Sequence, residues 1–134
     1  MPVQMELARL ILSETSDEQY IILKEKDGTR AFPIVIGSVE AFSIRRSVVG
    51  ETTPRPMTHD LVVNILHELR VEPVDVVITE LREHTYFAQL RVRHNGELVA
   101  IDARPSDAIA VAVRCRPPLP IFVDESVLEQ ALGG

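Results

Sequence analysis

Carboxylates stand at the starts of two expected helices, each directly after an apolar strand. Both segments open with a candidate N-cap, Gly37 or Arg104, and both carry an acid three residues later, Glu40 or Asp107. A carboxylate at the third helical position complements the helix dipole, so capping alone explains each acid taken singly. The symmetric pair favours a second interpretation, in which both carboxylates reach one cleft and act on a bound group there.

A histidine next to an aspartate opens a further expected helix, within residues 55–60 (Arg-Pro-Met-Thr-His-Asp). Histidine titrates near neutral pH and can exchange a proton, while a neighbouring carboxylate can hold its tautomer or bind a metal. Thr58 is the expected N-cap. The structural alternative is that Asp60 only stabilises the helix start and that His59 is half-buried.

Two acids, Asp102 and Asp107, flank Arg104 at a junction between a strand and a helix. One interpretation is a mutually satisfied pair between arginine and carboxylate, and the other is a phosphate held by Arg104 and the helix N-terminus. Carboxylates that hold Mg²⁺ beside an arginine that holds phosphate would supply a site for phosphodiester cleavage. The sequence contains no Gly-rich phosphate loop, cysteine-based zinc spacing or serine nucleophile elbow.

The remaining histidines and the single cysteine carry no expected chemistry. His67, His84 and His94 fall on polar faces or turns and are expected at the surface. The run 108–113 is apolar all round, so the helix that contains it is expected to be buried on most sides. Cys115 follows this run and is expected to be an inert core residue.

The elements that position these residues follow from apolar periodicity and turn signals. Pro33 places its strand at a sheet edge or a bulge. Asp27-Gly28 and Asn95-Gly96 mark hairpin turns, and Pro54 and Pro56 mark an irregular loop over 51–57. The expected strands are 3–12, 20–23, 30–36, 74–82, 85–94, 97–103 and 121–123, and the expected helices are 38–49, 58–70, 105–115 and 126–132.

The two halves of the chain resemble each other under a shift of 67 residues, which aligns 40–44 with 107–111. The hairpin signal also returns, one residue out of register. We therefore expect one domain over 1–134, built from pseudo-repeats of about 1–70 and 71–134, each with three strands followed by helices. The expected class is α+β, with a mixed sheet rolled toward a barrel and helices outside.

The composition and the net charge limit which classes of molecule the chain is expected to bind. The chain has 134 residues, is 46% hydrophobic and carries a net charge of −6, so general attraction to nucleic acid or anionic lipid is not expected. Arginine supplies most of its 14 basic residues, which leaves a local phosphate site open. A single cysteine, no membrane span and no export signal together favour the cytoplasm.

Three segments together resemble the bifunctional nuclease domain family: residues 32–41 (FPIVIGSVEA), 55–61 (RPMTHDL) and 102–110 (DARPSDAIA). The resemblance covers nearly the whole chain. It implies a duplicated α+β domain, a nuclease activity on both DNA and RNA, and a tendency to form homodimers.

The leading hypothesis is therefore a nuclease that hydrolyses phosphodiester bonds of DNA and RNA with little sequence preference, assisted by Mg²⁺ or Mn²⁺. The competing hypothesis is a non-catalytic, dimeric interaction or regulatory module whose polar residues only cap helices and pair with each other. The candidate catalytic residues are His59, Asp60, Glu40 and Asp107, the candidate metal ligands are Glu40, Asp60 and Asp107, and the candidate substrate-binding residues are Arg55, Arg104, Thr58 and Ser106.

Overall fold

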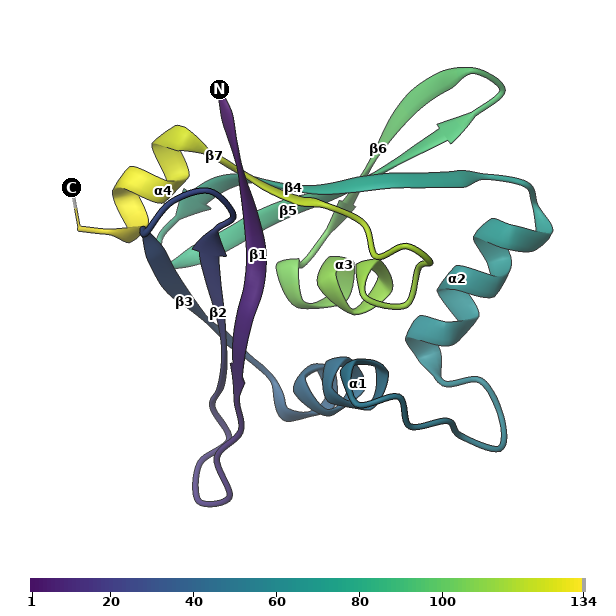
Figure 1. Cartoon of the computed structure of the whole chain (residues 1–134), viewed down its shortest axis with the longest axis horizontal. Helices are drawn as coiled ribbons and strands as arrows, with labels where there is room; N and C mark the ends of the chain where they lie inside the picture. The colour runs from purple at the N-terminus through teal and green to yellow at the C-terminus, as the bar shows by residue number, and fades with distance from the viewer. Residues whose placement is uncertain (134) are drawn as a thin grey trace.

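The computed structural model describes residues 1–133 as an α+β domain with one seven-stranded sheet and four helices (Figure 1). The elements, in chain order, are β1 (Pro2–Ile11), β2 (Gln19–Glu25), β3 (Ala31–Ile36), α1 (Ser38–Val48), α2 (Thr58–Glu68), β4 (Glu72–Arg82), β5 (Thr85–His94), β6 (Glu97–Ala103), α3 (Pro105–Ala112), β7 (Ile121–Asp124) and α4 (Glu125–Ala131).

Two antiparallel meanders make up most of the sheet, whose order is β3-β2-β1-β7-β4-β5-β6. The short strand β7 joins them, because it pairs antiparallel with β1 and parallel with β4. Figure 1 shows β1, β2 and β3 running steeply across the direction of β4 and β5. Pro33 lies on the edge strand β3, where its missing N–H costs no ladder hydrogen bond, as expected.

The sheet is open rather than closed: β3 and β6 are its two edges. The expectation of a sheet rolled toward a barrel is wrong in this respect, because no hydrogen-bonded register joins β3 to β6. The halves share the order of three strands and a helix, but α2 follows α1 whereas β7 and α4 follow α3. That the halves superpose as a duplication stays a prediction.

The helix α3 lies at the centre of the layer of helices, in contact with α1, α2, β4 and β5. Alanines 108, 110 and 112 are at most 1% exposed, and their small side chains let neighbouring backbones approach closely. Cys115 is buried as expected, and His67, His84 and His94 are exposed as expected. The helix ends at Ala112, earlier than the expected Cys115.

The apolar face expected for the helix over 58–70 is only partly covered. Val62 and Leu66 pack against the core, whereas Leu61, Ile65 and Leu69 are 53%, 47% and 66% exposed. The reason is that α2 packs mainly against α3 and β4. Within residues 1–133, no helix has the length and apolar character needed to cross a membrane.

Candidate functional site

The site lies where three helix starts converge on one groove of about 470 Å³. Gly37 and Arg104 are the N-caps of α1 and α3, as the sequence predicts, so Glu40 and Asp107 both lie in a first helical turn. The groove is lined by these two acids and by Thr58 and His59 of α2, together with Arg104 and the end of β6. The helices that follow the two edge strands thus bring both acids to one place.

His59 is the centre of the polar contacts in this groove, and only 7% of it is exposed. Its Nε2 atom lies 2.8 Å from Asp107 Oδ1, and its Nδ1 atom lies 2.6 Å from Ser43 Oγ. Ser43 is on α1 and is 2% exposed, so the imidazole is held between α1 and α3. Both ring nitrogens are therefore bonded and the ring orientation is fixed.

Arg104 reaches both acids of the groove. Its Nε atom donates to Asp107 Oδ2 at 2.9 Å, and its Nη2 atom lies 2.8 Å from the same oxygen and 3.6 Å from Glu40 Oε2. Its side chain is 65% exposed, and within residues 1–133 no hydrogen bond engages its Nη1 atom. Burial acts to raise the pKa of Asp107, but the hydrogen bonds from His59 and Arg104 outweigh it and lower that pKa from its ordinary value. Asp107 is thus an anion at neutral pH.

Asp60 points away from this groove and belongs to a separate contact. Its Oδ1 accepts from Arg114 Nε at 2.7 Å, and its Oδ2 accepts from the backbone N–H of Met57 at 2.9 Å. Met57, not the expected Thr58, is therefore the N-cap of α2. Burial acts to raise the pKa of Asp60, but these two contacts lower it overall.

Arg114 joins the two sets of contacts. Its Nη2 atom donates to Ser43 Oγ at 3.0 Å and to the Ser43 carbonyl at 3.1 Å, and its Nη1 atom donates to the Ala110 carbonyl at 2.8 Å. With one lone pair of Ser43 Oγ occupied by Arg114, the hydroxyl proton can point to His59 Nδ1, which leaves the imidazole proton on Nε2 facing Asp107. Each of the five side chains in this hydrogen-bonded series, from Asp60 through Arg114, Ser43 and His59 to Asp107, then has a hydrogen-bond partner.

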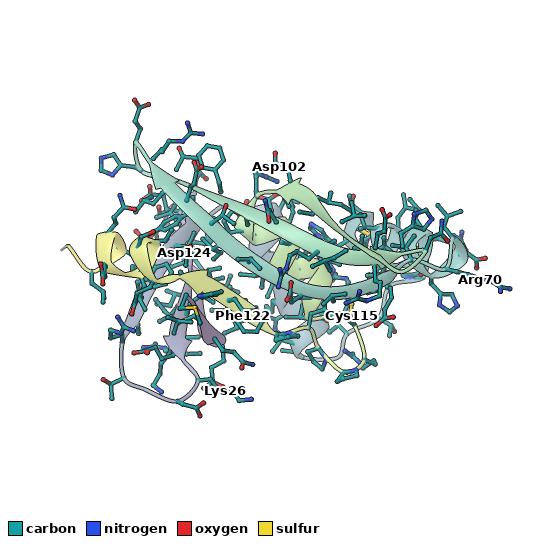
Figure 2. The ribbon with its side chains drawn as sticks, turned by 90° about the horizontal axis from the view of Figure 1, so that it is seen from above. Lys26, Arg70, Asp102, Cys115, Phe122 and Asp124 are labelled. Carbon is teal, nitrogen blue, oxygen red and sulfur yellow. The ribbon has the colours of Figure 1, made fainter. Side chains whose placement is uncertain are left out.

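The other candidate residues lie at different distances from this centre. Thr58 lines the groove, whereas Ser106 is 5% exposed and lines a different cavity together with Gly37. Arg55 is exposed in the loop before α2, where its carbonyl accepts from Thr53 Oγ1. Asp102, which is labelled in Figure 2, is exposed at the end of β6 and also lines the groove, but within residues 1–133 no ion pair joins it to Arg104. Arg104 therefore pairs with Asp107 and Glu40, and not with the nearer acid in sequence.

Comparison with known proteins decides the family. The model of the bifunctional nuclease domain matches residues 21–132. The chain belongs to the bifunctional nuclease domain family. A 34% identical relative, an uncharacterized protein of Mycobacterium tuberculosis, is matched over 96% of this chain and 75% of its own length.

Plant relatives carry the family's name. Bifunctional nuclease 1 of Arabidopsis thaliana is 32% identical over 75% of this chain and 32% of its own length. Bifunctional nuclease 1 of Oryza sativa subsp. japonica is 26% identical over 84% of this chain and 35% of its own length. The chain spans about a third of the length of these plant proteins.

Two polar residues of this bifunctional nuclease domain were not among the residues expected from the sequence: Ser43, which is buried, and Arg114, whose side chain is 8% exposed. Each has a signal in the sequence, because each places a polar side chain directly beside apolar residues. Ser43 lies between Ala41 and Ile44 on the buried side of α1, and Arg114 follows the apolar run that ends at Val113. A polar group at such a position must find a partner, so it indicates a buried hydrogen-bond network.

The candidate metal ligands are engaged by arginines of the same bifunctional nuclease domain. Asp60 is bonded to Arg114, and Arg104 contacts both Asp107 and Glu40. Within residues 1–133, no three His, Cys, Asp or Glu side chains are arranged to hold a metal ion. In this arrangement the three acids do not fit a shared divalent cation.

Proposed function

We propose that this domain hydrolyses phosphodiester bonds of DNA and RNA with little sequence preference, using the groove that contains Arg104, His59 and Asp107. The observation that carries the proposal is an arginine with a free, exposed nitrogen beside a fixed pair of histidine and aspartate. Such a set combines a phosphate ligand with a group that can take up a proton. Membership of the family and the names of the plant relatives support the same activity.

In the proposed reaction Arg104 binds a non-bridging oxygen of the scissile phosphate. The attacking water gives its proton to Asp107, which is 35% exposed and therefore the accessible member of the pair. His59 is a positioning residue, because its Nε2–H holds the Asp107 carboxylate in place. The bond from phosphorus to one sugar oxygen breaks, and solvent protonates that oxygen, which yields a phosphomonoester and a hydroxyl end.

Assistance by Mg²⁺ or Mn²⁺ stays a prediction. A bound divalent ion would polarise the phosphate or activate the water. Since Glu40, Asp60 and Asp107 each contact an arginine, an ion would have to displace one of these contacts. The cleavage assay therefore includes arms with Mg²⁺, with Mn²⁺ and with a chelator.

The test incubates purified protein with end-labelled single- and double-stranded DNA and RNA. We expect cleavage by the wild type and its loss in Asp107→Asn and in Arg104→Gln. Arg104 is largely exposed, so its variant keeps the fold and separates chemistry from stability. Cleavage that is equal in all three proteins would reveal a contaminating nuclease and overturn the proposal, as would an inactive wild type on all four substrates.

The second candidate is a non-catalytic interaction or regulatory module. Two observations favour it: within residues 1–133 no buried side-chain polar atom lacks a partner, and α1 and α2 expose apolar side chains. An inactive wild type that nevertheless binds a partner through these helices would support this alternative.

A homodimer and a cytoplasmic location complete the proposal. The exposed apolar side chains of α1 and α2 include Val39, Phe42 and Leu61, which are 72%, 47% and 53% exposed. A second copy of the chain is the expected partner, since identical surfaces close most simply around a twofold axis. Light scattering of the purified protein and fractionation of cells test these two predictions.

A further inference from the structure

A second cavity, of about 480 Å³, lies between the end of α1, the loop before α2 and the segment after α3. Three arginines line it, Arg46, Arg114 and Arg116, together with polar side chains such as Thr52 and Asn64. None of the residues in the proposed reaction lines this cavity. It is therefore a separate place where a ligand could be held.

The charges around this cavity do not cancel. Its two acids are each bonded to an arginine: Asp60 to Arg114, and Glu51 to Arg45, which lies outside the cavity. Arg46 is half-buried, and within residues 1–133 neither Arg46 nor Arg116 has an ion pair. Arg116 uses Nη1 for two backbone carbonyls, which leaves its other guanidinium nitrogens available. Two guanidinium groups thus line the cavity without an ion pair, although the charge of Arg46 also acts on the carboxylate of Asp60.

The two arginines without an ion pair bear on how a chain of net charge −6 could bind an anionic ligand. Long-range attraction cannot bring a polyanion to this protein, so binding must come from local contacts. Planar guanidinium groups match phosphate oxygens in paired hydrogen bonds, and hydroxyl and amide side chains at the rim add donors. The chemistry of the cavity is therefore that of a phosphate site.

The cavity adjoins the groove through consecutive residues of α2. His59 faces the groove and Asp60 faces the cavity, and Arg114 is bonded both to Asp60 and to Ser43, the partner of His59. One hydrogen-bonded wall thus separates the two places. The groove and the cavity lie toward opposite ends of α3, because Arg104 is the N-cap of this helix and Arg114 and Arg116 follow its last residue, Ala112.

We propose that this cavity, which we call the Arg46–Arg116 cavity, binds a second phosphate of the same nucleic-acid strand whose scissile phosphate lies at Arg104. The inference rests on the proposed function and names how the substrate is held. The phosphate belongs to a strand rather than to a free anion, because a strand engages both places at once and so compensates for the acidic surface.

The experiment measures binding of an end-labelled single strand by fluorescence anisotropy at several salt concentrations, in the Asp107→Asn background. Gel analysis confirms that the strand stays intact. The variants are Arg46→Gln and Arg116→Gln, and Arg93→Gln is the matched control, since Arg93 is an exposed arginine of β5 that has no ion pair within residues 1–133 and lines neither the cavity nor the groove. We expect a several-fold loss of affinity for each cavity variant and a salt dependence shallower by about 0.7 in log–log slope for each lost contact. The control should keep the parent slope.

Inorganic phosphate, titrated by calorimetry, distinguishes a free anion from a strand. Tight binding of phosphate alone, with strand affinity unchanged in Arg46→Gln and Arg116→Gln, would overturn the proposal, as would cavity variants that behave like Arg93→Gln. Failure of the proposed function gives a different pattern, in which the wild type cleaves nothing although strand binding still depends on Arg46 and Arg116. That pattern would support the phosphate site without hydrolysis.

Discussion

The helices α1 and α3 follow the two edge strands of the sheet and begin alike, yet they are buried very differently. Each starts with an extended N-cap and carries an acid in its first turn. Seven of the eight residues of α3 are buried, whereas α1, with eleven residues, buries three. The outer side of α1 exposes Val39, Phe42 and Val48.

The difference comes from side-chain size and from position. The alternating alanines of α3 allow α1, α2 and the sheet to approach it on several sides. The corresponding acids also differ: Asp107 is bonded to both His59 and Arg104, but Glu40 has only a 3.6 Å contact with Arg104. Similar local sequences have therefore produced one central helix, whose acid is bonded to His59 and Arg104, and one peripheral helix, whose outer side exposes apolar side chains.

The largest expected effect is on the two corresponding acids, Asp107 of α3 and Glu40 of α1. Asp107→Asn should lower the rate of phosphodiester cleavage by roughly 10²–10⁴-fold, the usual contribution of a positioned acid–base group. Glu40→Gln should lower it by less than about tenfold, because a long contact to an exposed arginine contributes little. Rates on one labelled single strand, measured for both variants, make the comparison. Equal losses would show that the two acids act as a symmetric pair.

A second test removes the matched apolar residues, Ile109 and Phe42, which the shift of 67 residues aligns. Ile109→Ala should lower the free energy of unfolding by about 2–5 kcal/mol, since Ile109 is fully buried in α3. Phe42→Ala should cost less than about 1 kcal/mol in the monomer, because 47% of Phe42 is exposed. Urea denaturation at a concentration that keeps the chain monomeric measures both values.

Much of this contrast could be predicted from the sequence, and part of it could not. The apolar run from Ala108 to Val113 correctly predicted that α3 is buried on most sides, and the N-caps at Gly37 and Arg104 followed from helix-start chemistry. The exposure of α1 and α2 did not follow, because apolar periodicity shows which face prefers burial and not whether another element covers it.

The contacts within the site were likewise predictable only in part. Adjacent residues in a motif suggested a shared site for His59 and Asp60, but consecutive residues on a helix point in different directions, and the two side chains face different cavities. The partner of His59 is instead Asp107, which is 48 residues away in sequence. The open sheet was also missed, since strand lengths and turns do not specify whether two edges meet.

A third prediction sharpens the role of the peripheral helix. Phe42→Glu places a charge in the exposed apolar surface of α1 and should weaken self-association by at least about tenfold, because an unpaired charge at the centre of an interface is costly. Light scattering over a dilution series should show the wild type at twice 15.0 kDa and the variant as the monomer. A monomeric wild type at every concentration would contradict the homodimer.

The smallest expected effect is on the stability of the fold at acid pH, and it concerns the carboxylate of Asp107 on α3. The pKa of Asp107 is lowered in the folded protein from its ordinary value of 3.8, against the opposing effect of burial. A carboxyl group with a depressed folded pKa stabilises the fold above its unfolded pKa, and this contribution is lost as the pH falls through the folded pKa. Stability should therefore decline from about pH 5 downward, and Asp107→Asn should make that decline shallower.

Asp60→Asn should also make the decline shallower, since the pKa of Asp60 is lowered by its contacts with Met57 and Arg114, which outweigh the effect of burial. Urea midpoints measured across this pH range give the slopes. An unchanged slope in Asp107→Asn would mean that the hydrogen bonds from His59 and Arg104 do not stabilise the ionised carboxylate, and the contrast between α1 and α3 would then rest on packing alone.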